Sequence, residues 1–83
     1  MTPEAAVEEF DALVRSAPPV PLTDEVRVNR RRATKLVAVL GGSAAGSTLQ
    51  QLVEQARKVP LTGQVRLDPD AVFAYLDEIR ATR

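Results

Sequence analysis

Three consecutive arginines are the most unusual local feature of this sequence. Arg30, Arg31 and Arg32, followed by Lys35, come directly after Asn29. Because Asn29 is a good N-cap, the arginines fall in the first turn of a predicted helix, where the dipole disfavours cations. Backbone N–H groups in the same turn lack helical partners and attract anions. The pattern predicts a partner- or anion-binding site for phosphate, nucleic acid or an acidic protein surface; the alternative is a solvated charge run.

A glycine-rich segment at residues 41–48 is similar to a phosphate-binding loop. Gly41 and Gly46 have the separation of that motif, and a helix is predicted to follow. Ser47 stands where the motif has the lysine that reaches the phosphates. We therefore interpret residues 41–47 as a linker, and a nucleotide hydrolase built on this loop is the alternative.

The remaining inventory of reactive side chains is poor. The chain contains no His and no Cys, so the usual general base, thiolate nucleophile and soft metal ligands are missing. Asp68 is interpreted as a helix cap, and Asp70, Asp77 and Glu78 as surface charges, rather than as catalytic carboxylates. We expect no enzyme, no catalytic residues, no bound metal and no cofactor.

The charge balance argues against bulk attraction to nucleic acid or to anionic membranes. Eleven basic and eleven acidic residues give a net charge of zero, although a basic middle lies between acidic ends. The longest uncharged stretch, residues 36–53, contains three glycines and several polar residues, so it predicts no membrane span. The first residues are acidic and lack a signal-peptide core. We expect a cytoplasmic protein.

The helices and strands that position the arginines and the glycine-rich segment belong to a sequence unit that occurs twice. Residues 20–29 return as residues 59–68 at an offset of 39, with six of ten positions identical. Apolar residues at helical spacing flank both copies, and each copy alternates between apolar and polar residues. Such a repeat indicates one supersecondary unit used twice, here helix, strand, helix.

Capping and alternation predict the bounds of these elements. Helices begin at Pro3, after Asn29, at Ser47 (a capping box with Gln50) and at Pro69, and strands cover residues 22–28 and 61–67. The inward strand residues are predicted to be Leu22, Val26, Val28, Leu61, Val65 and Leu67.

These elements predict an α+β fold in a single domain, residues 1–83. Repeat 1 covers residues 1–42 and repeat 2 covers residues 47–83. Because an isolated strand leaves its backbone unsatisfied, the two strands are expected to form an antiparallel ribbon with pseudo-twofold symmetry and four helices on its apolar face. Strand pairing between chains, or two helical hairpins with extended connectors, are the alternatives.

The outward face of that ribbon raises the possibility of DNA binding. It would present Arg27 and Arg66 beside Thr23 and Thr62, and a two-stranded ribbon fits the DNA major groove. Residues 22–57 resemble the ribbon-helix-helix fold of small bacterial repressors, in which outward strand side chains read bases. The chain departs from that family by carrying both strands itself and by having a helix before the first strand.

A second resemblance covers each repeat more fully. Residues 52–62, 65–68 and 71–80 resemble a short N-terminal module of DivIVA-like bacterial cell-division proteins, well over residues 49–80 and more weakly over residues 10–40. The resemblance implies a non-enzymatic scaffold that associates with itself and recruits partners. The module occurs twice here and no coiled coil follows it.

The leading functional hypothesis is a protein–protein interaction or scaffold module. The first helical turn with Arg30, Arg31, Arg32 and Lys35, together with the apolar helix faces, is expected to bind another protein or further copies of the chain in a homo-oligomer. The alternative is a DNA-binding regulator that uses Arg27, Arg66, Thr23 and Thr62.

Overall fold

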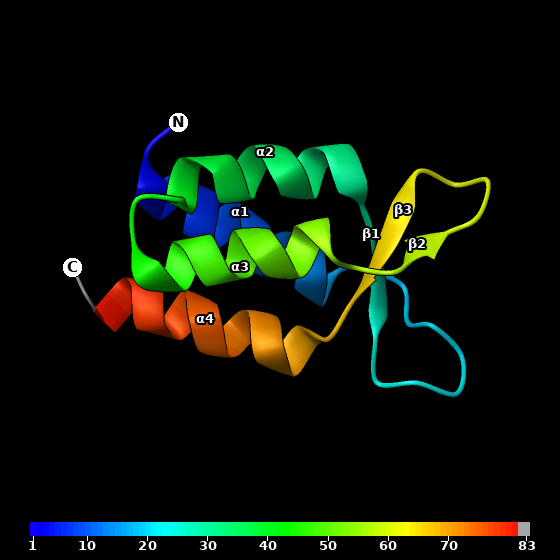
Figure 1. The fold of residues 1–83 in the computed structure, drawn as a ribbon. Coiled ribbons are helices and arrows are strands. Elements are labelled where there is room, and N and C mark those ends of the chain that lie inside the picture. Colours follow the sequence, from blue (N-terminus) through cyan, green and yellow to red (C-terminus); the bar gives the residue numbers. More distant parts are fainter. Residues whose placement is uncertain (82–83) are drawn as a thin grey trace.

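The structure is a computed structural model that describes residues 1–81, and it has the expected α+β class with four helices and a small antiparallel sheet (Figure 1). The elements in chain order are α1 (Pro3–Arg15), β1 (Val26–Asn29), α2 (Arg30–Leu40), α3 (Ala44–Glu54), β2 (Lys58–Val59), β3 (Gln64–Leu67) and α4 (Pro69–Ala81). No helix within residues 1–81 is long and apolar enough to cross a bilayer.

Three helices begin where the sequence predicts. The side chains of Thr2 and Asn29 cap α1 and α2, each accepting a backbone N–H from the following turn at 3.2 and 3.0 Å. Asp68 accepts the N–H of Asp70 at 3.0 Å, and Pro69 opens α4. Each cap satisfies a donor that the helix itself leaves without a partner.

The predicted start of the third helix is wrong, because Ser43 rather than Ser47 is its cap. The Ser43 hydroxyl accepts the N–H of Gly46 at 3.0 Å, so α3 begins at Ala44 and the connection to α2 shortens to residues 41–43. A Cβ atom on Gly46 would lie 1.6 Å from the carbonyl oxygen of Leu40. The small residue therefore allows the start of α3 to contact the backbone at the end of α2.

The predicted antiparallel pairing of the two repeated strands within the chain is confirmed. In the β1–β3 pair Arg27 lies opposite Arg66 and Val28 opposite Val65. The two-stranded ribbon is wrong, since β2 pairs with the other edge of β3 and gives the strand order β1-β3-β2. On the edge of β1 that faces away from β3, Pro19 makes a single antiparallel bridge with Val26.

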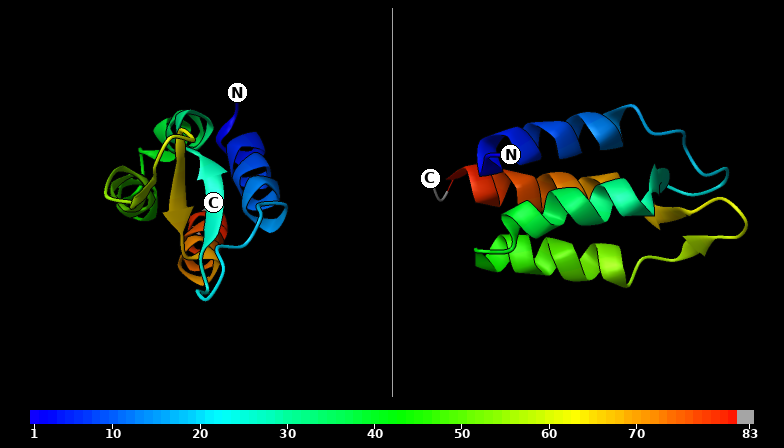
Figure 2. Two further views of the ribbon diagram at one scale, coloured as in Figure 1. Left: turned by 90° about the vertical axis from the view of Figure 1, so that its right-hand side faces the viewer. Right: turned by 90° about the horizontal axis from the view of Figure 1, so that it is seen from above.

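The helices form a ring in which α1, α2, α3 and α4 each contact the next and α4 contacts α1. The strands lie across one end of this bundle, and the molecule as a whole measures 36 × 20 × 19 Å (Figures 1 and 2). Val28, Val65 and Leu67 are buried against the helices as predicted, and Val26 is half-buried. Phe10 of α1 is among the largest fully buried side chains. The sheet thus covers the core at one end of the bundle, opposite the end at which α2 connects to α3 (Figure 1).

Candidate interaction surface

Two turns at the sheet end of the molecule expose leucines to solvent. Arm 1 (residues 20–25) leads into β1 and arm 2 (residues 59–64) leads into β3 (Figure 1). Leu22 and Leu61 have relative exposures of 105% and 106%, and both have a φ of 66°. The prediction that they point inward is wrong. The strands begin only at Val26 and Gln64, so the alternation does not extend into the turns.

A threonine hydroxyl fixes each arm in the same way. The Thr23 hydroxyl donates to the Val20 carbonyl at 2.9 Å and accepts the N–H of Glu25 at 3.1 Å. The Thr62 hydroxyl donates to the Val59 carbonyl at 2.9 Å and accepts the N–H of Gln64 at 3.2 Å. The predicted position of Thr23 and Thr62 on the outer face of a ribbon is therefore wrong, because both side chains complete turns.

The conformation of the two leucines is energetically unfavourable. An L-residue in the left-handed region costs about 1–2 kcal/mol, and only Gly, Asn and Asp visit this region routinely. A fully exposed leucine also gains nothing from burial within the chain. Strained residues of this kind cluster at binding and switch sites. Leu22 and Leu61 thus share one unfavourable conformation, and burial within residues 1–81 does not offset it.

The predicted basic site lies beside arm 2. Arg30, Arg31, Arg32 and Lys35 are all exposed, and a hollow of about 520 Å³ is lined by Arg30, Arg31 and Lys35 together with Asn29, Thr34 and Gly63. The expectation of free N–H groups in this turn is wrong for two of them. The N–H of Arg30 donates to Gly63 at 3.1 Å, and that of Arg32 donates to the Asn29 cap. Attraction of an anion therefore depends on the side-chain charges.

A second hollow connects the basic cluster to the exposed leucine. Its volume is about 330 Å³, and it shares Arg30 and Gly63 with the first. It adds a cation that the sequence analysis did not assign to the site, Lys58. No signal in the sequence placed this residue, because only the pairing of β2 with β3 brings it close to Arg30. The hollow is lined by Arg30, Lys58, Val59, Pro60, Leu61, Gly63 and Gln64.

Arg27 and Arg66 lie side by side, as the DNA-binding hypothesis requires, but neither is freely exposed. Both are half-buried, and the Nε atoms of both are buried without a hydrogen-bond partner. Glu25 accepts from Arg66 Nη2 at 2.5 Å. One of the two candidate base-reading cations is therefore already paired with a carboxylate.

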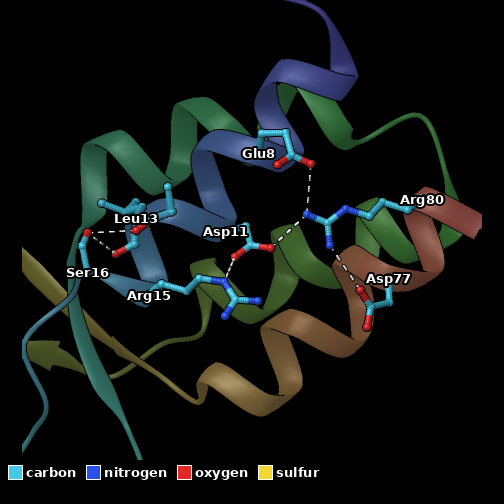
Figure 3. A network of polar contacts seen from close by, with 8 residues as sticks. Glu8, Asp11, Leu13, Arg15, Ser16, Asp77 and Arg80 are labelled. Carbon is cyan, nitrogen blue, oxygen red and sulfur yellow. Dashed lines mark hydrogen bonds and ion pairs between the residues drawn. The ribbon is translucent and has the colours of Figure 1, made fainter.

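A polar network that the sequence analysis missed joins α1 to α4 (Figure 3). Asp11, which is buried, accepts from Arg15 one turn away and from Arg80 at 2.9 Å. Arg80 also contacts Glu8 and Asp77, each at 3.2 Å. The spacing of Asp11 and Arg15 was the available sequence signal, since oppositely charged residues four apart meet on a helix.

This network predicts an acid-sensitive contribution to stability. The hydrogen bond from Arg80 lowers the pKa of Asp11 below its ordinary value of 3.8, against the opposing effect of burial, and Arg15 lowers it further. Because the folded pKa lies below the unfolded one, the contribution is complete above about pH 4 and is lost as the pH falls through the folded pKa.

We expect Asp11→Asn to lose stability relative to the native protein at neutral pH, and that difference to shrink below about pH 4. Urea unfolding at a series of pH values measures it. Asp77→Asn, at an exposed partner of the same Arg80, is the control and should leave the acid dependence unchanged. A constant difference between Asp11→Asn and the native protein across this range would contradict the assignment.

No family model matches the chain, and neither the curated proteins nor the solved structures give a match.

Proposed function

We propose that this protein is a non-enzymatic interaction module that docks through arm 1 and arm 2. The observation that carries the proposal is the pair of fully exposed leucines, Leu22 and Leu61, each in a left-handed conformation. A partner that buries both side chains would offset their unfavourable conformation. The exposed cations beside arm 2 would give the contact electrostatic selectivity.

Internal symmetry supports a module with two equivalent arms. Arg27 and Arg66 are equivalent in the repeat and lie directly opposite each other in the β1–β3 pair. Leu22 and Leu61 are also equivalent, and they share one φ value. We infer a pseudo-twofold axis that passes between the two arginines and relates arm 1 to arm 2.

The resemblance of residues 49–80 to the DivIVA-like module supports a more specific proposal, namely a scaffold or adaptor in bacterial cell division. In that role the chain would recruit or join other components. The duplication would place two contact points on one small domain, which strengthens binding when both points engage the same partner.

A double substitution of the leucines separates binding from stability. Leu22→Asn with Leu61→Asn is expected to raise the free energy of unfolding by about 0.5–1 kcal/mol per site, because Asn tolerates the left-handed region. The melting temperature should then rise by roughly 4–8 °C per kcal/mol. The same variant should lose its partner, since the apolar contact is gone.

Site-specific photo-crosslinking in the native host measures the binding. A photoreactive residue at position 22 or 61 should give discrete crosslinked species, whereas the same residue at Gln51, exposed on α3, should not. Leu22→Met with Leu61→Met keeps the apolar side chains and should bind normally. An asparagine variant that melts lower than the native protein, or that still binds its partner, would count against the proposal.

One observation favours DNA binding by the sheet as a second candidate, namely the juxtaposition of Arg27 and Arg66. It predicts retardation of host DNA at low salt and loss of that retardation in Arg27→Ala. The ion pair between Arg66 and Glu25 opposes it, since a phosphate or base would have to displace the carboxylate.

A further inference from the structure

The two arms have matching backbones and opposite charges. Arm 2 contacts the start of α2, where the N–H of Arg30 donates to the Gly63 carbonyl at 3.1 Å. Seen from the sheet end, arm 1 lies on the same side of the sheet as the start of α4 (Figure 2, left), and both arms extend beyond the helix ends (Figure 1). Arm 1 carries the exposed carboxylate Asp24, and the β1–β3 register places the exposed Asp68 one residue beyond the pair Val26–Leu67, at the arm 1 end of that pair, with Asp70 following in the first turn of α4. The exposed cations Arg30 and Lys58 share a hollow with Leu61, and Arg31 and Lys35 line the adjoining hollow with Gly63 of arm 2; Arg32 follows in the same turn of α2.

Within residues 1–81 none of the charges listed above forms an ion pair. The ion pairs in this part of the chain join Asp11 to Arg15 and Arg80, and Arg80 to Glu8 and Asp77. A further ion pair joins Glu25 of arm 1 to Arg66. The arms thus present one acidic and one basic apolar tip at the same end of the molecule (Figure 1). Because the two tips have opposite charges and equivalent positions, they suit a contact in which the acidic tip of one molecule binds the basic tip of another.

We propose that a second copy of this chain binds at the arms, end to end. Arm 1 of each copy would contact arm 2 of the other, about a twofold axis perpendicular to the long axis of the bundle. Both acidic–basic contacts then form at once, and Leu22 of one copy packs against Leu61 of its partner. Such an isologous pair is closed, so it gives a dimer rather than a filament. The inference rests on the proposed function and identifies its partner.

The acidic tip distinguishes a second copy from other anionic partners. A nucleic acid or an anionic bilayer would attract the cations near Leu61 but repel the carboxylates near Leu22. Since the two leucines lie at the same end, such a partner could not favour both. A second copy satisfies both arms, and the net charge of zero adds no overall repulsion between copies.

Sedimentation equilibrium and light scattering of the native chain test the dimer. The contact is small, so we expect a dissociation constant between about 10 µM and 1 mM, weakening as salt rises from about 50 to 500 mM. The measured mass should approach two chains and go no higher. Leu22→Asn should weaken the dimer at least tenfold, whereas Leu22→Met should not.

Charge reversal gives the sharper test. Asp24→Lys with Asp70→Lys makes both arms basic, and Arg30→Glu with Arg31→Glu and Lys35→Glu makes both acidic. Each variant alone should be monomeric, and an equimolar mixture should form a dimer at least as tight as the native one. Glu78→Lys, at an exposed position near the opposite end of α4, adds positive charge and should dimerise normally. Thermal melts establish that each variant is folded.

Several results would overturn the inference. One is a folded native chain that stays monomeric at about 1 mM and low salt. A second is a mixture of the two reversed variants that stays monomeric. A third is a monomer that binds phosphatidylglycerol vesicles or DNA through Arg31 and Lys35. If the native chain is monomeric while position 22 crosslinks to a different protein in the host, the self-association fails and the proposed function stands. If position 22 crosslinks to nothing, both fail.

Discussion

Gly46→Ala is expected to lower the free energy of unfolding by about 3 kcal/mol or more, because the added Cβ would lie 1.6 Å from the Leu40 carbonyl oxygen and 2.6 Å from its carbon. The atoms in the way are backbone, so α2 and α3 must separate. Helix propensity predicts the opposite sign, with alanine favoured over glycine by about 1 kcal/mol inside a helix. Thermal and urea unfolding measure the change, and the melting temperature should fall by more than about 10 °C.

Gly42→Ala is the matched control, four residues earlier in the connection before α3. A Cβ on Gly42 would meet nothing within 4 Å, so this substitution should leave stability unchanged or raise it by up to about 1 kcal/mol. Equal stability of the two alanine variants would show that the close contact between α2 and α3 does not exist.

The helix starts could be predicted because they depend on local chemistry. Asn29 caps α2 through a hydrogen bond to a residue three positions away, and the bounds of α2 follow from it and from Gly41. The start of α3 could not be predicted in the same way, because both Ser43 and Ser47 are acceptable caps. The choice between them depends on how Gly46 packs against α2, which is a tertiary contact.

The predicted strand starts are wrong in both arms, because the alternation of apolar and polar residues continues into the turns. Leu61, Val65 and Leu67 are all spaced as residues on one face of a strand, yet the first is exposed and the other two are buried. A period of two is equally compatible with a strand that begins three residues later, at Gln64. The deciding signal is Thr62 followed by Gly63, a pair typical of turns.

The basic cluster could be predicted from charge alone, but its setting could not. Three consecutive arginines identify an exposed cationic surface in any fold. That Lys58 and Leu61 share a hollow with Arg30 follows from the pairing of β2 with β3 and from the contact between Arg30 and Gly63. The β2–β3 pairing joins residues five to seven positions apart, and the contact between Arg30 and Gly63 joins residues 33 positions apart; the sequence alone specifies neither.

Leu67→Asp is expected to unfold the domain. Leu67 is 1% exposed in β3 and lies opposite Val26, so the substitution removes a packed side chain and buries a carboxylate among apolar groups. Loss of the side chain costs about 2–5 kcal/mol, and the unpaired charge adds several more. A domain of this length has roughly 4–12 kcal/mol to lose. Circular dichroism and the melting transition measure the loss.

The same substitution at Leu61 should leave the domain folded. Leu61 is fully exposed at a φ of 66°, and Asp tolerates this conformation better than Leu, so Leu61→Asp should leave the melting temperature unchanged or slightly higher. Leu67→Met, which keeps the volume, should cost less than about 1.5 kcal/mol. If both residues lay on one buried face, as simple alternation predicts, the two aspartates would unfold the domain equally. A large difference between them requires that the strand begins after Leu61 and that the Leu61 side chain points to solvent while Leu67 points into the core.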